Sequence, residues 1–125
     1  MKIRIKGDSI RYRLTQTEVK TFCEKGIYTE TTHFGTNEFT YALQAKEGIA
    51  AMEAEFNDRT ITLFVPKEDC SNWSDSDRVG YQNVMPLGDG KELSLLLEKD
   101  FACLDNTSED QSDNYPNPKS GTDPC

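Results

Sequence analysis

The chain has 125 residues, 35% hydrophobic and 29% charged, a composition typical of one soluble globular domain. Its formal net charge of −8 disfavours binding to nucleic acid or to anionic membrane surfaces, because both are themselves negatively charged. No apolar run approaches the roughly 20 residues of a membrane helix, and the charged N-terminal segment does not resemble a signal peptide, so a cytoplasmic location is expected.

The first predicted elements form a β-hairpin. Residues Lys2–Lys6 and Ile10–Leu14 alternate polar and apolar side chains with the two-residue period of half-buried strands. The turn between them is Gly7-Asp8-Ser9, in which Gly and Asp tolerate positive φ. Five basic side chains are therefore expected on one face of the sheet: Lys2, Arg4, Lys6, Arg11 and Arg13. Because like charges opposite one another destabilise a hairpin, the pattern predicts a compensating partner.

A short helix and two more strands complete the first half of the chain. Thr15 and Glu18 have the S/T-x-x-E spacing of a capping box, and Gly26 is placed to end the helix. Strands are then predicted over Ile27–Phe34 and Phe39–Gln44. The first half is thus predicted to be a ββαββ unit.

The second half repeats this order of elements. Met52 aligns with Met1, Ile61 with Ile10, and Trp73 with Phe22. The predicted elements are strands over 52–57 and Thr60–Val65, a helix over Lys67–Ser74, and strands over Val79–Met85 and Glu92–Glu98. Residues 1–49 and 50–103 are therefore expected to be two repeats within a single domain, because neither repeat can bury its apolar face alone.

The predicted fold is α+β and β-rich, with eight mostly antiparallel strands and two short helices related by pseudo-twofold symmetry. Closure of two curved four-stranded halves into a barrel removes every sheet edge and is favoured; two stacked sheets are the alternative. Residues 104–125 contain little apolar surface and are predicted to be an acidic C-terminal tail, partly extended or disordered. Within it, Tyr115–Pro118 is the part expected to dock on the domain as a strap.

The charged hairpins provide the main candidate site. Glu53 and Glu55 occupy the positions of Lys2 and Arg4 in the first repeat, so one hairpin is basic and the other acidic. If both faces point into a barrel, the arginines would bind a phosphate or carboxylate, and the glutamates would hold a divalent metal on the same ligand. If they point outwards, they are solvated faces or pair with each other. The candidate ligand-binding residues are Arg4, Arg11, Arg13, Glu53, Glu55 and His33.

Other chemistry-bearing residues give weaker signals. The chain has one histidine, His33, and four cysteines without C-x-x-C spacing: Cys23, Cys70, Cys103 and Cys125. The thiols are expected to be reduced, and a Cys–His pair with His33 is left open. A second open alternative is a Ca²⁺ or Mg²⁺ site in the tail, built from Asp105, Glu109, Asp110 and Asp113. The sequence contains no nucleophile elbow, H-E-x-x-H motif or Gly-rich phosphate loop, so no catalytic residue is assigned.

Two resemblances add to this interpretation. Much of the chain resembles a small bacterial family of uncharacterised proteins, through Lys2–Gly7, Ile10–Thr15, Thr31–Gly35, Glu98–Phe101 and Tyr115–Pro118. This resemblance implies no activity, but it implies that the tail as far as Pro118 belongs to the domain. The segment Met52–Asn57 is also loosely similar to the Glu-x-Glu-x-Lys strand of triphosphate tunnel enzymes, with Asn57 in place of the lysine.

The sequence therefore predicts a small bacterial protein that acts as a non-enzymatic ligand-binding or protein-interaction module. The alternative is a protein that binds or hydrolyses phosphate or polyphosphate, using a charged barrel interior and a divalent metal. No other cofactor is predicted. The expected partner is a small anion or a protein, and a homodimer is a further alternative.

Overall fold

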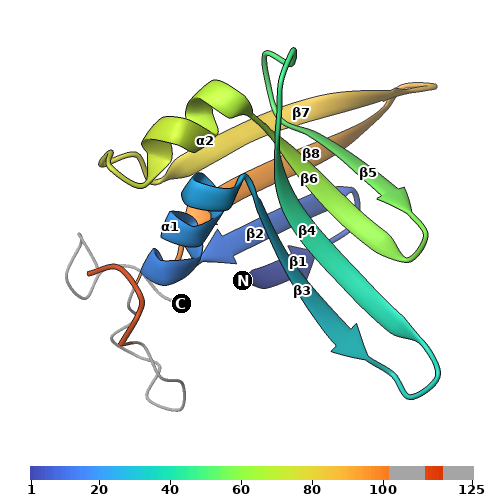
Figure 1. Cartoon of the computed structure of the whole chain (residues 1–125). Helices are drawn as coiled ribbons and strands as arrows, with labels where there is room; N and C mark the ends of the chain where they lie inside the picture. The colour runs from blue at the N-terminus through green and yellow to red at the C-terminus, as the bar shows by residue number, and fades with distance from the viewer. Residues whose placement is uncertain (102–111, 117–125) are drawn as a thin grey trace.

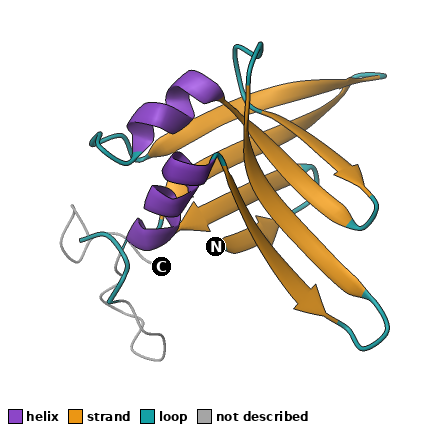
Figure 2. Cartoon of the chain, viewed as in Figure 1, coloured by secondary structure: helices purple, strands orange, loops and turns teal. Residues whose placement is uncertain are grey.

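The computed structural model describes residues 1–101 and 112–116, which form two successive ββαββ units (Figures 1 and 2). The first comprises β1 (Lys2–Ile5), β2 (Ser9–Leu14), α1 (Gln16–Lys25), β3 (Ile27–His33) and β4 (Glu38–Lys46). The second comprises β5 (Glu53–Asn57), β6 (Thr60–Pro66), α2 (Lys67–Trp73), β7 (Gly80–Gly88) and β8 (Lys91–Lys99). The predicted β-rich α+β fold with a roughly duplicated unit is confirmed. Most of the predicted tail lies outside the described residues.

The strands form two four-stranded sheets, and each sheet takes one hairpin from each half of the chain. Their strand orders are β1-β2-β8-β7 and β3-β4-β6-β5. The central pairs, β2 with β8 and β4 with β6, are parallel, and the other pairs are antiparallel. The two central pairs have equivalent registers. Ile10 lies opposite Leu95, and Ile61, which is the equivalent of Ile10 in the second repeat, lies opposite Tyr41.

The favoured barrel is wrong for the described part of the chain, and the alternative of two sheets is confirmed. A barrel would need strand pairing between the sheet edges, β1 with β3 and β5 with β7. Side-chain contacts join these edges instead. The amino group of Met1 binds Glu30 of β3 at 2.8 Å, and the Asn83 amide of β7 donates to the Met52 carbonyl, next to β5, at 2.8 Å.

The apolar core lies between the two sheets and beneath the helices. The inward positions of β2 and β6 are all buried, as the two-residue period predicts: Ile10, Tyr12 and Leu14, and Ile61, Leu63 and Val65. The Tyr12 hydroxyl crosses from one sheet to the other and donates to the Ile61 carbonyl at 3.1 Å. Figure 1 shows α1 and α2 side by side at one end of the sheets, while the hairpin tips diverge at the other end.

Helix α1 begins and ends where the sequence predicts. The Thr15 amide donates to the Glu18 carboxylate at 2.8 Å, the reciprocal contact of a capping box. Gly26 follows the helix at φ +77°, and its amide donates to the Phe22 carbonyl at 2.7 Å. Glycine suits this left-handed position because it has no Cβ.

Glu18 also connects α1 to the start of β1. Its carboxylate accepts hydrogen bonds from the Met1 amino group and from the Tyr28 hydroxyl, and the Tyr41 hydroxyl donates to the Met1 carbonyl at 2.8 Å. Burial acts to raise the pKa of Glu18, but the hydrogen bonds from Met1 and Thr15 outweigh burial, so its pKa lies below the ordinary 4.5. The ionised carboxylate therefore stabilises the fold.

Replacing Glu18 by glutamine should lower the melting temperature at pH 7 more than at pH 3.5. Because the folded-state pKa of Glu18 is lowered, its contribution to stability is present above about pH 4.5 and is lost as the pH falls through the folded-state value. Thermal melts of the wild type and Glu18→Gln at both pH values test this. Glu24→Gln, an exposed change on the same helix, is the control. An equal effect of Glu18→Gln at both pH values would contradict the expectation.

Residues 112–116 dock on the domain beside α1. The backbone amide of Tyr115 donates to the backbone carbonyl of Asp100 at 2.8 Å, and the backbone amide of Gln16 donates to the backbone carbonyl of Asp113 at 3.0 Å. The rings of Tyr115 and Phe101 lie 5.6 Å apart. The predicted docking of Tyr115 is therefore confirmed, while Asn117 and Pro118 lie outside the described residues.

Candidate functional site

The predicted basic residues lie on the outer face of the sheet β1-β2-β8-β7. Arg4 stands directly opposite Arg11 and Lys2 opposite Arg13, and the alternate residues of β2 point into the core. The shared face is therefore confirmed for Lys2, Arg4, Arg11 and Arg13, while Lys6 follows the end of β1 and its placement on this face stays a prediction. We call this surface the basic face and define it by Lys2, Arg4, Arg11 and Arg13.

Among the residues that the structure describes, Glu98 and Asp100 contact the basic face. Glu98 of β8 accepts from Arg11 Nε at 2.7 Å and from Arg13 Nε at 2.6 Å, both on its Oε1 atom. Asp100 lies 3.1 Å from the Lys2 ammonium. Sequence reasoning missed Glu98 as the compensating partner, although it is the one acidic residue in the run Leu93–Lys99. The missing information was the parallel pairing of β2 with β8, which places Glu98 beside Arg13.

The predicted acidic residues and His33 belong to the other sheet. Glu53 of β5 lies 3.4 Å from Lys46, and His33 Nε2 lies 3.4 Å from Glu38 at the tip of the β3–β4 hairpin. The structure brings Arg11 and Arg13 together on Glu98, but it does not bring Glu53, Glu55 or His33 to them. The predicted charged interior is therefore wrong, because the buried strand positions are apolar except for Lys99 at the end of β8. A ligand-binding role for these surface residues stays a prediction.

The other open alternatives concern the thiols and metal ions. Cys23 and Cys70 lie on α1 and α2, whereas His33 lies at the end of β3 remote from α1. Burial raises the pKa of Cys70 to about 11, so its thiol stays protonated at neutral pH.

Among residues 1–101 and 112–116 no three His, Cys, Asp or Glu side chains gather as a metal-binding group. The proposed tail ligands Asp105, Glu109 and Asp110, together with Cys103 and Cys125, lie outside the described residues, while Asp113 accepts from the Thr17 hydroxyl at 2.9 Å.

An apolar cleft of about 350 Å³ lies between the two sheets. Its lining residues belong to the ends of the hairpins that Figure 1 shows pointing away from the helices. Three hairpins supply its walls through Ile5, Gly7, Ile10, Ala54, Glu55, Phe56, Ile61, Met85, Leu87 and Leu93. At its mouth Ile5, Phe56 and Leu87 are 55%, 70% and 49% exposed. At its floor Ile10 and Ile61 are buried and belong to the core. The cleft is therefore an open continuation of the core.

The cleft arises because the inward alternation of apolar residues continues to the hairpin tips after the sheets have diverged. Ile5 and Phe56 follow the same two-residue period as the core positions of β1 and β5. Periodicity gives the face on which a side chain lies, but not the separation between two facing sheets. Sequence reasoning therefore missed the cleft.

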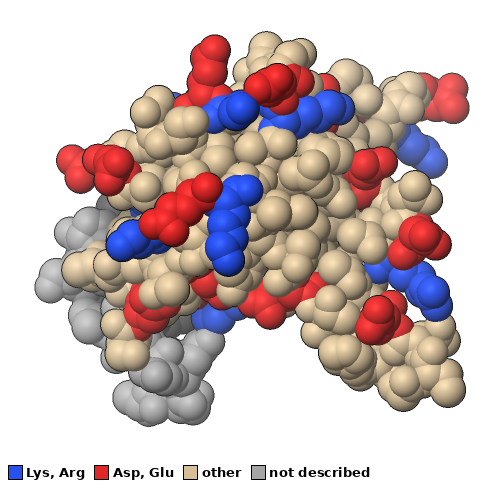
Figure 3. Space-filling model, in the orientation of Figure 1, with Lys and Arg blue, Asp and Glu red and all other residues tan. Residues whose placement is uncertain are grey.

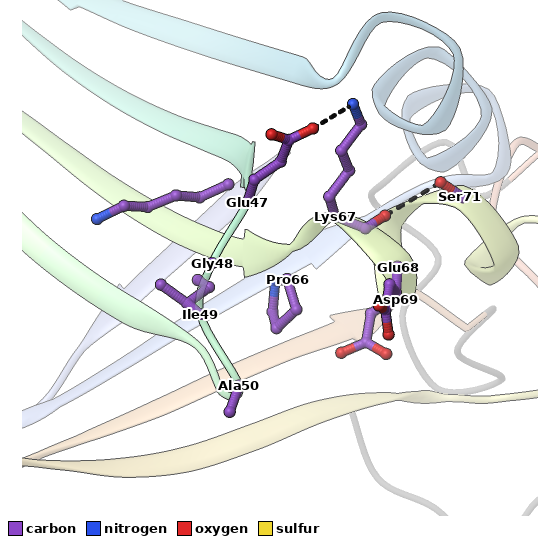
Figure 4. A pocket seen from close by; sticks show the side chains of 10 residues that line it. Glu47, Gly48, Ile49, Ala50, Pro66, Lys67, Glu68, Asp69 and Ser71 are labelled. Atoms are coloured by element: carbon purple, nitrogen blue, oxygen red, sulfur yellow. Dashed lines mark hydrogen bonds and ion pairs between the residues drawn. The ribbon is translucent and has the colours of Figure 1, made fainter.

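A second, more polar hollow of about 890 Å³ lies between residues 46–50 and the start of α2 (Figure 4). Its two sides are joined by an ion pair between Lys67 and Glu47, whose atoms lie 2.9 Å apart. The hydrogen bond from Lys67 lowers the pKa of Glu47. The charges of this pair therefore compensate each other across the hollow. The face shown in Figure 3 likewise has acidic and basic side chains interspersed.

A lysine is buried near the docked residues 112–116. Lys99 Nζ donates to the Ser76 carbonyl at 2.7 Å and lies 5.0 Å from the centre of the Tyr115 ring. Burial lowers the pKa of Lys99. Burial also raises the pKa of Tyr115, to about 12, so the phenol stays protonated beside the lysine. These contacts attach residues 112–116 to the domain.

The fold and these surfaces define a small α+β domain of two sheets, with an apolar cleft between the sheets and a basic face outside one of them. A family model matches residues 1–119, so the chain belongs to a family of unknown function, DUF7009. The resemblance to an uncharacterised family is thereby confirmed. No curated protein and no solved structure matches the chain. Within the part of the chain that the structure describes, no helix has the length and apolar character to span a membrane.

Proposed function

We propose that the protein is a non-enzymatic binding module that holds a small molecule with an apolar body in the cleft between its sheets. One observation carries this proposal. Ile5, Phe56 and Leu87 come from three different hairpins, are each about half exposed or more, and line the same cleft. Large apolar side chains that gather on a concave surface are typical of ligand-binding sites.

The size and lining of the cleft support a small ligand. A volume of about 350 Å³ lies within the range of about 300–1,000 Å³ typical of small-molecule sites. Covering the exposed parts of the three side chains would contribute to affinity by removing apolar surface from water, at about 25 cal/mol per Å². Among the described residues that line the cleft, Glu55 is the single ionisable group. Such a lining favours binding over acid–base catalysis, which generally needs a donor and an acceptor of protons.

Replacing Leu87 by serine should weaken the binding of the apolar dye 1-anilinonaphthalene-8-sulfonate by about fivefold to tenfold. The change removes the apolar end of one wall of the cleft, which corresponds to about 1 kcal/mol of contact with the ligand. A fluorescence titration of the dye, repeated in competition with n-decanol as a linear apolar ligand, measures the effect.

The matched control is Val84→Ser, because Val84 is also 49% exposed but lies outside the cleft. It should leave dye affinity unchanged. Equal dye affinity in the wild type, Leu87→Ser and Val84→Ser would contradict the proposal, as would a failure of decanol to displace the dye. Melting temperatures of the two variants separate loss of the cleft from loss of the fold.

A further inference from the structure

We propose that the basic face is a docking surface for an extended acidic segment of a partner protein. This surface lies on the outside of the sheet β1-β2-β8-β7 and is separate from the cleft between the sheets. The proposal is independent of the small-molecule site. It rests on the arrangement of four cations and on the contacts that orient the two arginines of β2.

The first step is the unfavourable placement of like charges. Arg4 faces Arg11 and Lys2 faces Arg13 across neighbouring strands, and such pairs destabilise a sheet. Within residues 1–101 and 112–116, Arg4 forms no ion pair. Glu98 contacts both Arg11 and Arg13, so one carboxylate serves two guanidinium groups. Asp100 lies 3.1 Å from the Lys2 ammonium, so within the described residues two carboxylates face four cations, and this surface stays positive on a chain whose net charge is −8.

The second step is the orientation of the arginines. Arg11 and Arg13 each use Nε to bind the same oxygen of Glu98, so Glu98 holds the two guanidinium groups side by side. The side chains of Arg11 and Arg13 are 27% and 33% exposed, and a guanidinium presents its N–H donors as a fork that matches the two oxygens of a carboxylate. Glu98 is therefore a positioning residue, and the arginines are the groups that contact the partner.

The third step is the spacing of the cations, which favours an extended peptide over a single small anion. Arg11 and Arg13 are two residues apart on β2, as are Lys2 and Arg4 on β1, and such side chains repeat at about 6.6 Å along a strand. Carboxylates at alternate positions of an extended peptide repeat at the same distance. Leu96 lies beside Arg11 on the same face, and an apolar contact between charges is typical of protein interfaces.

The test uses fluorescence anisotropy of a labelled peptide of alternating Glu and Leu, with the full chain as the binding protein. We expect binding that weakens as salt increases, because it depends on exposed charges. Arg4→Glu should weaken it by about tenfold, because it removes one attraction and adds one repulsion. The same variant should melt at the wild-type temperature or above it, because it places a carboxylate opposite Arg11. If Arg4 only stabilised the sheet, Arg4→Glu would not weaken peptide binding while leaving the melting temperature unchanged or higher.

The matched control is Lys20→Glu, the same change of charge at an exposed position of α1, which should leave peptide affinity unchanged. Leu87→Ser should also leave it unchanged, which separates this surface from the cleft. The proposal is overturned by equal affinities of Arg4→Glu and Lys20→Glu for the peptide, or by a lower melting temperature of Arg4→Glu. It is also overturned if inorganic triphosphate or a labelled oligonucleotide binds the same face more tightly than the peptide.

Discussion

Replacing Trp73 by alanine should lower the free energy of unfolding by about 3–5 kcal/mol, which is typical of removing a fully buried large aromatic side chain. Trp73 is 0% exposed, its ring packs edge-on against Tyr81 at 5.8 Å, and its Nε1 donates to the Arg78 carbonyl at 3.0 Å. Alanine would leave a cavity beneath α2 and an unsatisfied carbonyl beside it. Urea denaturation followed by circular dichroism measures the loss.

Trp73→Phe is the control for this experiment, because Phe22 fills the equivalent position under α1 and is also fully buried. It should destabilise the protein by less than half as much as Trp73→Ala, because phenylalanine fills most of the space. The remaining loss comes from the missing indole hydrogen bond. A loss below about 1 kcal/mol for Trp73→Ala would mean that the fold does not depend on the packing of the Trp73 side chain beneath α2.

Replacing Gly80 by alanine should also destabilise the protein severely, by about 3 kcal/mol or more. A Cβ at this position would lie 2.0 Å from the Leu97 carbonyl oxygen and 2.8 Å from the Glu98 Cα atom, both of them backbone atoms of β8. Neither atom can move away without separating β7 from β8. Thermal unfolding together with hydrogen exchange of the β8 amides would report the loss of this pairing.

The control is Gly35→Ala, where glycine serves a different purpose. Gly35 has φ +81°, and a Cβ added there would meet no atom within 4 Å, so alanine encounters backbone strain alone, about 1 kcal/mol. We expect the effect of Gly80→Ala to be clearly the larger of the two. Equal effects would show that close approach of the strands is not what requires glycine at position 80.

Local chemistry made most of the individual elements predictable. The alternation in Ile10–Leu14 and Thr60–Val65 identified strands, and Glu18 and Gly26 identified the two ends of α1. The exception is the end of β7, where Pro86 and the glycines after it indicate a loop. The strand instead continues to Gly88 with an irregularity in register, which β7 tolerates because it is an edge strand.

The arrangement of these elements was not predictable by the same means. Periodicity and turn residues identify a hairpin, but the parallel contacts of β2 with β8 join residues far apart in the sequence. The sequence therefore favours a closed barrel that the structure does not have, and it does not identify Glu98 as the partner of Arg11 and Arg13. The basic face itself was predictable, because it follows from alternation within one hairpin. The cleft was not, because it depends on how far the two sheets diverge.

The parallel pairing also determines the order in which the chain can fold during synthesis. Ser9 of β2 pairs with Ser94 of β8, so the β1–β2 hairpin can complete its sheet only after β8, the last strand of the described residues, has been synthesised. The sheet β3-β4-β6-β5 uses residues 27–66 alone and can form earlier. Until β8 emerges, the apolar side of β1 and β2 has no completed sheet of its own, and exposed apolar surface of this kind makes a nascent segment prone to aggregation.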